Sequence, residues 1–201
     1  MKAWITFVLT LTICSSVSAN SPTLLVFGDS LSAAFGIEQQ QGWGALLQKR
    51  LQQKNHDYKV INASISGETT SGGLSRLPAL LHRYQPKIVI IALGANDGLR
   101  GLSLKQMHVN LNSIIEQSKH KGATVLLVGM QLPPNYGPAY TKLFHDTFKQ
   151  LASSQNVPLI PFLLDGIGKD KSMFQQDGLH PTAMAQVKIL DNIWIKLQQL
   201  L

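Results

Sequence analysis

The amino-acid sequence predicts an α/β protein, a three-layer α/β/α sandwich around a five-stranded parallel sheet. Short apolar runs recur along the chain, and stretches with helical spacing of apolar residues separate them. The runs are almost continuously apolar, which is typical of parallel strands that are covered on both faces. The chain has 201 residues, and domains usually contain roughly 100–200 residues, so we expect one domain.

The expected strands are the apolar runs. The clearest is the run at 88–93, which is uniformly apolar and stops at Gly94. The last run contains Pro158 and Pro161, and we therefore expect it to be short. The expected strands span residues 23–27, 58–62, 88–93, 124–128 and 157–162.

The expected helices lie between these strands and after the last one. Apolar residues recur at helical spacing from Trp43 to Leu51. Ser103 is a suitable N-cap and Gly122 a suitable C-terminal stop for the longest internal helix, and Pro181 suits the first turn of the last helix. The expected helices span residues 43–51, 74–84, 103–121, 140–154 and 181–201.

Residues 1–19 have the pattern of a secretory signal peptide, so the domain is expected to span residues 20–201. Lys2 precedes a run, 3–14, that is shorter than the ~20 apolar residues needed to span a bilayer. Small residues then end at Ala19, so an N-terminal anchor helix is the weaker alternative. We expect a periplasmic or secreted bacterial protein. Its only cysteine, Cys14, would be removed, which excludes a thiol nucleophile, a disulfide framework and a cysteine zinc site.

The composition indicates a folded, basic protein. Hydrophobic residues make up 44% of the chain, which excludes a disordered chain. The net charge is +7, and it becomes +6 when Lys2 is removed. The basic residues form no block, so we expect no nucleic-acid partner. The positive charge fits attraction to anionic lipid or acyl carriers, including transient contact with a membrane surface. We expect a monomer.

Four polar segments follow predicted strands or precede the last helix. They span residues 28–32, 62–68, 94–97 and 177–180. Ligands of parallel α/β sheets bind at the carboxyl ends of the strands. The topology therefore predicts that these four segments, which are far apart in sequence, meet at one edge of the sheet.

These segments contain the groups that acyl transfer requires. Ser30 is a candidate nucleophile, His180 the base that would take its proton, and Asp177 the carboxylate that would orient the base. The N–H of Ser30, the N–H of Gly67 and the amide of Asn96 are candidate donors to the oxyanion. Each segment alone is typical of an ordinary turn, and Asp29 and Asp97 are expected to brace such turns. Their joint occurrence indicates a catalytic site.

The same segments resemble the four sequence blocks of the SGNH (GDSL) hydrolases. The matching residues are Gly28-Asp29-Ser30-Leu31-Ser32, Gly67, Gly94-Ala95-Asn96-Asp97 and Asp177-Gly178-Leu179-His180-Pro181. Segments 62–67, 77–81, 96–101 and 132–137 resemble the branch of acyl-CoA thioesterase I, lysophospholipase and arylesterase. The resemblance covers essentially the whole mature chain and implies the flavodoxin-like SGNH fold. It also implies Ser30, Asp177 and His180 as the catalytic residues and Ser30, Gly67 and Asn96 as the oxyanion hole. Ala95 departs from the glycine common in this branch.

The resemblance also implies a substrate class. We expect a serine hydrolase that cleaves acyl thioesters, aryl esters and lysophospholipids through an acyl-enzyme on Ser30, without a metal or cofactor. An apolar groove beside Ser30 would hold the acyl chain. The residues expected to line it are Ile65, Leu77, Leu132, Pro133 and Tyr136.

Several other enzyme classes lack support in the sequence. No Gly-x-Ser-x-Gly pentapeptide is present, as an α/β-hydrolase would require. Zinc-protease, P-loop and dinucleotide-binding motifs are also absent. Two alternatives remain on the same scaffold: a carbohydrate O-acetylesterase, which would need a polar site mouth, and a non-enzymatic lipid- or sugar-binding module. The intact set of nucleophile, base and donors argues against the second.

Overall fold

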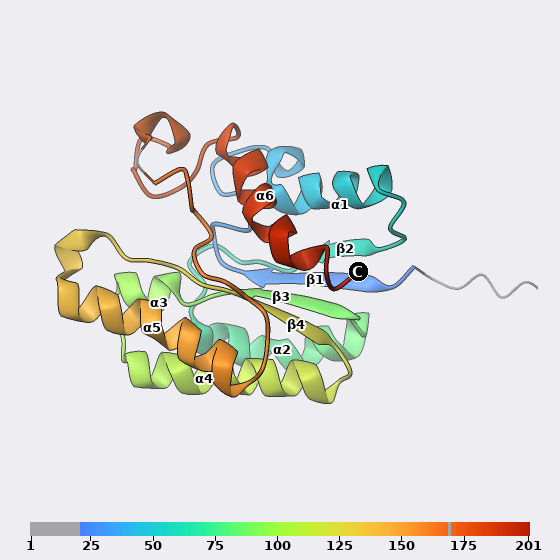
Figure 1. Ribbon diagram of the computed structural model, residues 1–201, viewed down its shortest axis with the longest axis horizontal. Coiled ribbons are helices and arrows are strands. Elements are labelled where there is room, and N and C mark those ends of the chain that lie inside the picture. Colours follow the sequence, from blue (N-terminus) through green and yellow to red (C-terminus); the bar gives the residue numbers. More distant parts are fainter. Residues whose placement is uncertain (1–20, 169) are drawn as a thin grey trace, which may run out of the picture.

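The computed structural model describes residues 21–168 and 170–201, so the expected signal peptide, 1–19, lies outside the described residues. Five parallel strands form one sheet in the order β2-β1-β3-β4-β5 (Figure 1). The predicted α/β class is confirmed. The strands are β1 (Thr23–Gly28), β2 (Lys59–Asn62), β3 (Ile88–Ala92), β4 (Thr124–Val128) and β5 (Leu159–Ile160).

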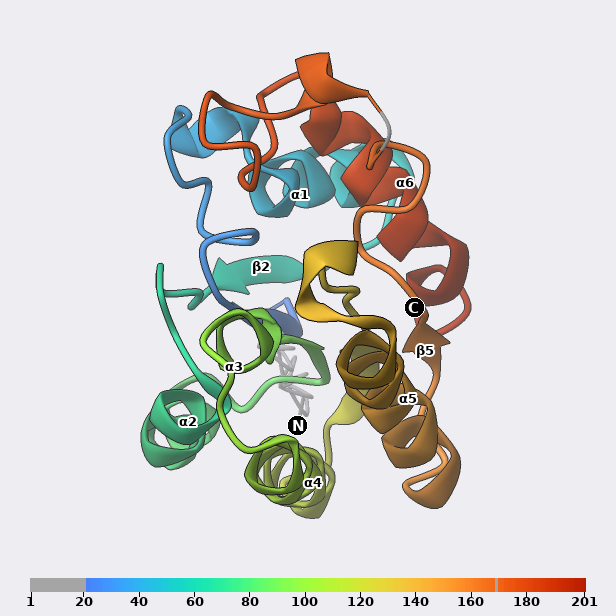
Figure 2. The ribbon, with the colours of Figure 1, turned by 90° about the vertical axis from the view of Figure 1, so that its left-hand side faces the viewer.

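The helices cover both faces of the sheet (Figure 2). Alternate residues of β1 point to opposite faces, as the period of a strand requires. Leu24 and Val26 join the core under α1 and α6, whereas Leu25 and Phe27 join the core under α2, α4 and α5. These helices are α1 (Trp43–Gln53), α2 (Thr70–Tyr84), α4 (Leu104–His120), α5 (Pro138–Ser154) and α6 (Ala185–Leu197).

The order of the strands reverses at β1. The chain goes from β1 to β2 on one side and then crosses to β3 on the other side. The carboxyl ends of β1 and β3 are aligned, because Gly28 is paired with Ala92. An open parallel sheet binds ligands at such a point of reversal. The segments that follow β1 and β3 are therefore the ones best placed to form a site.

Two elements begin earlier than their apolar patterns predict. Helix α2 begins at Thr70 rather than at residue 74, because the Thr69 side chain accepts a hydrogen bond from the Gly72 N–H and caps the helix. Helix α5 begins at Pro138, whose fixed φ suits a first helical position. The predicted Ser103 N-cap of α4 is confirmed, since its hydroxyl accepts from the Gln106 N–H at 3.2 Å.

The predicted start of the last helix is wrong. Helix α6 begins at Ala185, and Pro181 instead forms an antiparallel bridge with Phe174. The Gln175 N–H donates to the His180 carbonyl at 2.8 Å, and the Thr182 N–H donates to the Met173 carbonyl at 2.8 Å. These bonds close the segment before α6 into a loop, which the helical pattern of the sequence does not show.

The remaining differences concern short elements. Strand β5 has two residues, because Pro158 and Pro161 bracket it and cannot donate to a strand ladder. A five-residue helix, α3 (Ala95–Leu99), stands where the sequence predicted a turn. Three 3-10 helices complete the fold: Gln39–Gln41, Pro134–Tyr136 and Lys171–Met173. Within residues 21–168 and 170–201, no helix combines the length and apolar character needed to cross a membrane.

Leu77 tests the packing of α2 on the sheet. Its side chain has no exposed surface and lies in the core formed by α2, α4 and α5. We expect Leu77→Ala to lower the free energy of unfolding by about 2–5 kcal/mol, because a buried leucine leaves a cavity. Urea unfolding measures this change. Val109→Ala on α4 is the control, since Val109 is 47% exposed. A loss no larger than that of the control would contradict the assignment of Leu77 to the core.

Candidate active site

Ser30 lies in a tight turn directly after β1. The Asp29 carbonyl accepts hydrogen bonds from the N–H groups of Ser32 and Ala33, at 3.1 and 3.0 Å. Gly28 allows this turn to close against β3, because a Cβ at that position would lie 2.7 Å from the Ser32 hydroxyl and 3.0 Å from the Ala92 carbonyl. The turn leaves the Ser30 side chain half-buried at the carboxyl edge of the sheet.

Two side chains from other elements hold this turn. The Trp43 indole N–H donates to the Leu31 carbonyl at 3.2 Å, and the Asn62 amide donates to the Ser32 carbonyl at 2.7 Å. The helical spacing of apolar residues predicts for Trp43 only a place on the apolar face of a helix. Its indole nitrogen was the available signal for a second role, since a buried indole N–H usually has an acceptor.

Asp177, His180 and Ser30 form a continuous chain of hydrogen bonds. The His180 Nε2 is 2.9 Å from the Ser30 Oγ, and the His180 Nδ1 is 2.7 Å from the Asp177 Oδ2. The second carboxylate oxygen of Asp177 accepts from the N–H groups of His180 and Leu179, both at 2.9 Å. The loop before α6 thus brings the predicted carboxylate, imidazole and hydroxyl into contact.

The hydrogen bonds also settle the ionisation of Asp177. The backbone N–H of His180, then that of Leu179 and the His180 side chain, lower the pKa of the Asp177 carboxyl from 3.8 to about 2. Asp177 is therefore a carboxylate at neutral pH and accepts a hydrogen bond from the Nδ1–H of His180. A neutral His180 then has Nε2 free to accept the hydrogen bond of the Ser30 hydroxyl.

Phe35 packs against the imidazole. The two ring centroids are 4.3 Å apart. The Gln175 amide holds Phe35 in place by donating to the Phe35 carbonyl at 2.8 Å and to the Pro181 carbonyl at 3.1 Å. The next residue, Gly36, has φ +72°, and a Cβ there would lie 2.1 Å from the Gln175 side-chain oxygen. No local pattern indicates this contact, because Phe35 and Gln175 are far apart in sequence.

Gly67 and Asn96 lie beside each other at the same edge. The Asn96 Nδ2 donates to the carbonyl of Glu68 at 3.0 Å, and an Arg100 guanidinium nitrogen donates to the carbonyl of Gly67 at 2.9 Å. Gly67 has φ +77°, a region that favours glycine. Within residues 21–168 and 170–201, the backbone N–H groups of Ser30 and Gly67 donate to no protein acceptor.

The sequence of residues 26–186 matches the model of the GDSL-like lipase/acylhydrolase family. The chain belongs to this family. It is 51% identical to the esterase TesA of Pseudomonas aeruginosa, over 91% of each chain. It is 42% identical to thioesterase 1/protease 1/lysophospholipase L1 of Escherichia coli K12, over 91% of this chain and 86% of that protein. A crystal structure of TesA aligns with a TM-score of 0.87 at 51% identity, covering 89% of this chain and 99% of that one.

Membership of the acylhydrolase family establishes the class of enzyme. The chain is a hydrolase of the carboxylic ester and thioester class.

Among the residues that the structure describes, 21–168 and 170–201, no three His, Cys, Asp or Glu side chains are grouped to bind a metal ion.

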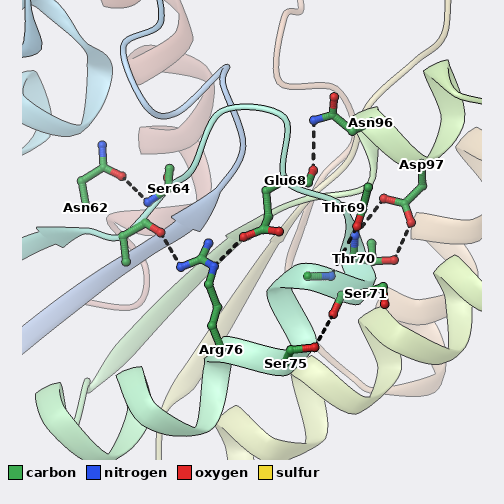
Figure 3. A network of polar contacts seen from close by, with 12 residues as sticks. Asn62, Ser64, Glu68, Thr69, Thr70, Ser71, Ser75, Arg76, Asn96 and Asp97 are labelled. Atoms are coloured by element: carbon green, nitrogen blue, oxygen red, sulfur yellow. Dashed lines mark hydrogen bonds and ion pairs between the residues drawn. The ribbon is translucent and has the colours of Figure 1, made fainter.

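The two aspartates next to Ser30 and Asn96 in the family blocks, Asp29 and Asp97, brace different parts of the structure. Asp29 braces its own turn, since its Oδ1 accepts from the Leu31 N–H at 3.0 Å. Asp97 instead accepts from the Thr70 N–H at 2.9 Å and the Thr70 hydroxyl at 2.6 Å, so it holds the start of α2 (Figure 3). Asn110 of α4 extends this buried network by donating to the Thr70 hydroxyl at 3.0 Å.

The residues expected to line a groove differ in how far they are exposed to solvent. Ile65 is 49% exposed in the turn before Gly67, and Leu132 is 8% exposed. Pro133 and Tyr136 are half-buried in the loop before α5, where the Tyr136 hydroxyl donates to the Leu99 carbonyl at 2.9 Å. Leu77 lies in the core of the sandwich and has no exposed surface, so we leave it out of the groove.

The burial of Asp29 predicts a pH dependence of stability. Burial raises the pKa of its carboxyl from 3.8 to about 7. Between these two values the folded state binds the proton more tightly than the unfolded state, so the contribution of Asp29 to stability falls as pH rises through this window. Asp29→Asn removes this loss and keeps an oxygen that accepts from the Leu31 N–H.

We therefore compare the free energy of unfolding of Asp29→Asn with that of the unmodified chain at pH 5 and at pH 8. The difference should shift in favour of Asp29→Asn by on the order of 1–3 kcal/mol when the pH is raised from 5 to 8. Urea unfolding at the two pH values measures the change. Asp170→Asn is the control, because hydrogen bonds from Ser172 lower the pKa of the Asp170 carboxyl and it titrates below this window. If the two variants change in parallel, Asp29 is ionised throughout and the assignment is wrong.

Proposed function

We propose that this chain hydrolyses acyl thioesters, aryl esters and lysophospholipids through an acyl-enzyme on Ser30. The observation that carries the proposal is the unbroken chain from Asp177 Oδ2 to His180 Nδ1, at 2.7 Å, and from His180 Nε2 to Ser30 Oγ, at 2.9 Å. A serine hydroxyl becomes an effective nucleophile when a positioned base removes its proton.

The reaction follows from these contacts in two halves. Ser30 Oγ attacks the acyl carbon while His180 Nε2 takes its proton, and Asp177 stabilises the resulting imidazolium. The imidazolium then gives that proton to the departing thiolate or alkoxide, which leaves as a thiol or alcohol. In the second half, His180 takes a proton from water, the hydroxide attacks the acyl carbon, and the proton returns to Ser30 as the carboxylic acid departs.

The oxyanion of each tetrahedral intermediate needs donors that are already in place. We assign this role to the N–H groups of Ser30 and Gly67 and to the amide of Asn96. Asn96 has two amide hydrogens, and one of them is bound to the Glu68 carbonyl. That bond fixes the amide plane and leaves the second hydrogen for the oxyanion.

The proposed substrate class rests on the apolar residues near this edge and on two relatives. Ile65, Leu132, Pro133 and Tyr136 remain our candidates to contact the acyl chain. The relative from P. aeruginosa is named an esterase, and the relative from E. coli is named a thioesterase and lysophospholipase. Each CH₂ that is buried on binding contributes about 0.8 kcal/mol, so an apolar wall favours longer acyl chains.

We also propose that the enzyme is secreted or periplasmic and acts as a monomer. The support for secretion is the sequence pattern of residues 1–19, in which Lys2 is followed by an apolar run and small residues. A net charge of +6 without Lys2 would favour transient contact with an anionic membrane surface, where lysophospholipids would be found.

The oxyanion assignment predicts the effect of Asn96→Ala. We expect kcat to fall on the order of 10²–10³-fold, because one preorganised donor is lost. Steady-state hydrolysis of a p-nitrophenyl ester measures the loss, with Ser30→Ala as the reference for nearly complete loss of turnover. Asn112→Ala on α4 is the control, because its amide contacts Glu116 instead of the site. Normal turnover in Ser30→Ala would reject the acyl-enzyme, and normal turnover in Asn96→Ala would reject its role in the oxyanion hole.

The proposed substrate class predicts a preference for long acyl chains. On p-nitrophenyl acetate, octanoate and palmitate, we expect kcat/KM to be higher for the two longer chains, since they bury more CH₂ groups. An acyl-CoA and a lysophospholipid extend the comparison, and Ser30→Ala corrects for hydrolysis that does not involve the site. A strict preference for acetyl esters or acetylated sugars would favour the O-acetylesterase alternative and overturn the proposal.

A further inference from the structure

Arg76 of α2 holds the segment that carries Gly67 at two points (Figure 3). Its Nε donates to the Glu68 carboxylate at 2.6 Å, and its Nη1 donates to the carbonyl of Ala63 at 2.7 Å. The Arg76 Cζ lies 4.4 Å from the centre of the Phe27 ring, near the end of β1. One side chain thus connects α2, β1 and both ends of segment 63–68.

Glu68 connects Arg76 to Asn96. Its carboxylate pairs with Arg76, its backbone carbonyl accepts from the Asn96 amide at 3.0 Å, and its N–H donates to the Ile65 carbonyl at 3.2 Å. Gly72 leaves room for the carboxylate, because a Cβ there would lie 2.0 Å from the Glu68 Oε1. Any shift of Glu68 therefore moves both the turn that contains Gly67 and the acceptor that orients Asn96.

We propose that Arg76 and Glu68 are a positioning pair that aligns the N–H of Gly67 and the amide of Asn96 with the oxyanion. This inference rests on the proposed function, in which those two groups are donors. Neither Arg76 nor Glu68 touches the reacting atoms. They act through the backbone of segment 63–68 and through the Glu68 carbonyl.

The chemistry of the pair suits this task. A guanidinium presents its donors in a rigid plane, so it holds a carboxylate and a carbonyl at once, whereas an ammonium is a single point charge. The Arg76 and Glu68 side chains are 21% and 12% exposed, so solvent screens the pair only in part.

The inference predicts that kcat is lost while KM is retained. Oxyanion donors act on the transition state, and a misplacement of about 1 Å in such a site can cost on the order of 10²-fold in rate. We expect Arg76→Met to lower kcat on a p-nitrophenyl ester about 10–100-fold, with KM within about 3-fold, because three of the four candidate acyl-chain contacts, Leu132, Pro133 and Tyr136, lie outside segment 63–68. Arg83→Met on the same helix is the matched control, since Arg83 is exposed and its guanidinium only stacks on Tyr84 at 5.1 Å.

A double-mutant cycle with Asn96→Ala separates positioning from a merely structural role. Residues that act as a unit show non-additive losses. If Arg76 acts partly through Asn96, Arg76→Met should cost several-fold less in the Asn96→Ala background than in the unmodified chain. Equal costs in the two backgrounds, a loss confined to KM, or a loss shared by Arg83→Met would overturn the inference.

Two conservative variants keep the test valid if Arg76→Met does not fold. Arg76→Lys retains the positive charge but not the planar set of guanidinium donors. Glu68→Gln retains the backbone carbonyl but not the ion pair with Arg76. We expect both variants to fold, which thermal unfolding checks. Their kcat should lie between that of the unmodified chain and that of Arg76→Met. Unchanged kcat in both would overturn the inference. Normal turnover in Asn96→Ala would instead reject the oxyanion role on which the inference rests, so the two failures are distinguishable.

Discussion

The hydrogen bond between His180 and Ser30 is the contact on which the site depends, and it joins residues 150 positions apart at 2.9 Å. No local structure can bring them together. The pairing of Gly28 with Ala92 fixes the position along the strand direction at which the chain leaves the sheet and turns at Ser30. The loop before α6 must then hold His180 within hydrogen-bonding distance of Ser30. The backbone hydrogen bonds that close residues 173–182 fix the shape of this loop. The geometry of the site is therefore a consequence of the register of the sheet and of the packing of α6.

The packing of α1 against α6 connects the last helix to the turn after β1. Gln186 of α6 accepts from the Trp43 N–H at 3.1 Å, and the Trp43 indole donates to the Leu31 carbonyl at 3.2 Å. The same two helices share a core over alternate residues of the sheet. The doubly covered sheet and the helices α1 and α6 thus support the turn that carries Ser30, while α2 and the Arg76–Glu68 pair support segment 63–68, which carries Gly67.

Most of the fold, and the residues that meet at the carboxyl edge of the sheet, could be predicted from the sequence, because they depend on local patterns. Uninterrupted apolar runs identify the strands, the polar residues at their ends identify Ser30 and Asn96, and the polar segment before the last helix identifies His180. The roles of Pro181 and Leu77 could not be predicted in this way. Pro181 pairs with Phe174 across a loop, and Leu77 is buried in the core that α2 shares with α4 and α5. Both depend on contacts between distant segments.

The aspartates of the site show why residue type alone does not assign a role. Asp177 is exposed and accepts three hydrogen bonds, which lower its pKa to about 2 and keep it charged as a partner for His180. Asp29, next to Ser30, is buried with one donor from the Leu31 backbone, and burial raises its pKa to about 7. The two carboxyl groups lie on either side of the same serine and histidine, yet their surroundings move their pKa values in opposite directions, by burial at Asp29 and by hydrogen bonds at Asp177. Only the exposed one contacts the imidazole.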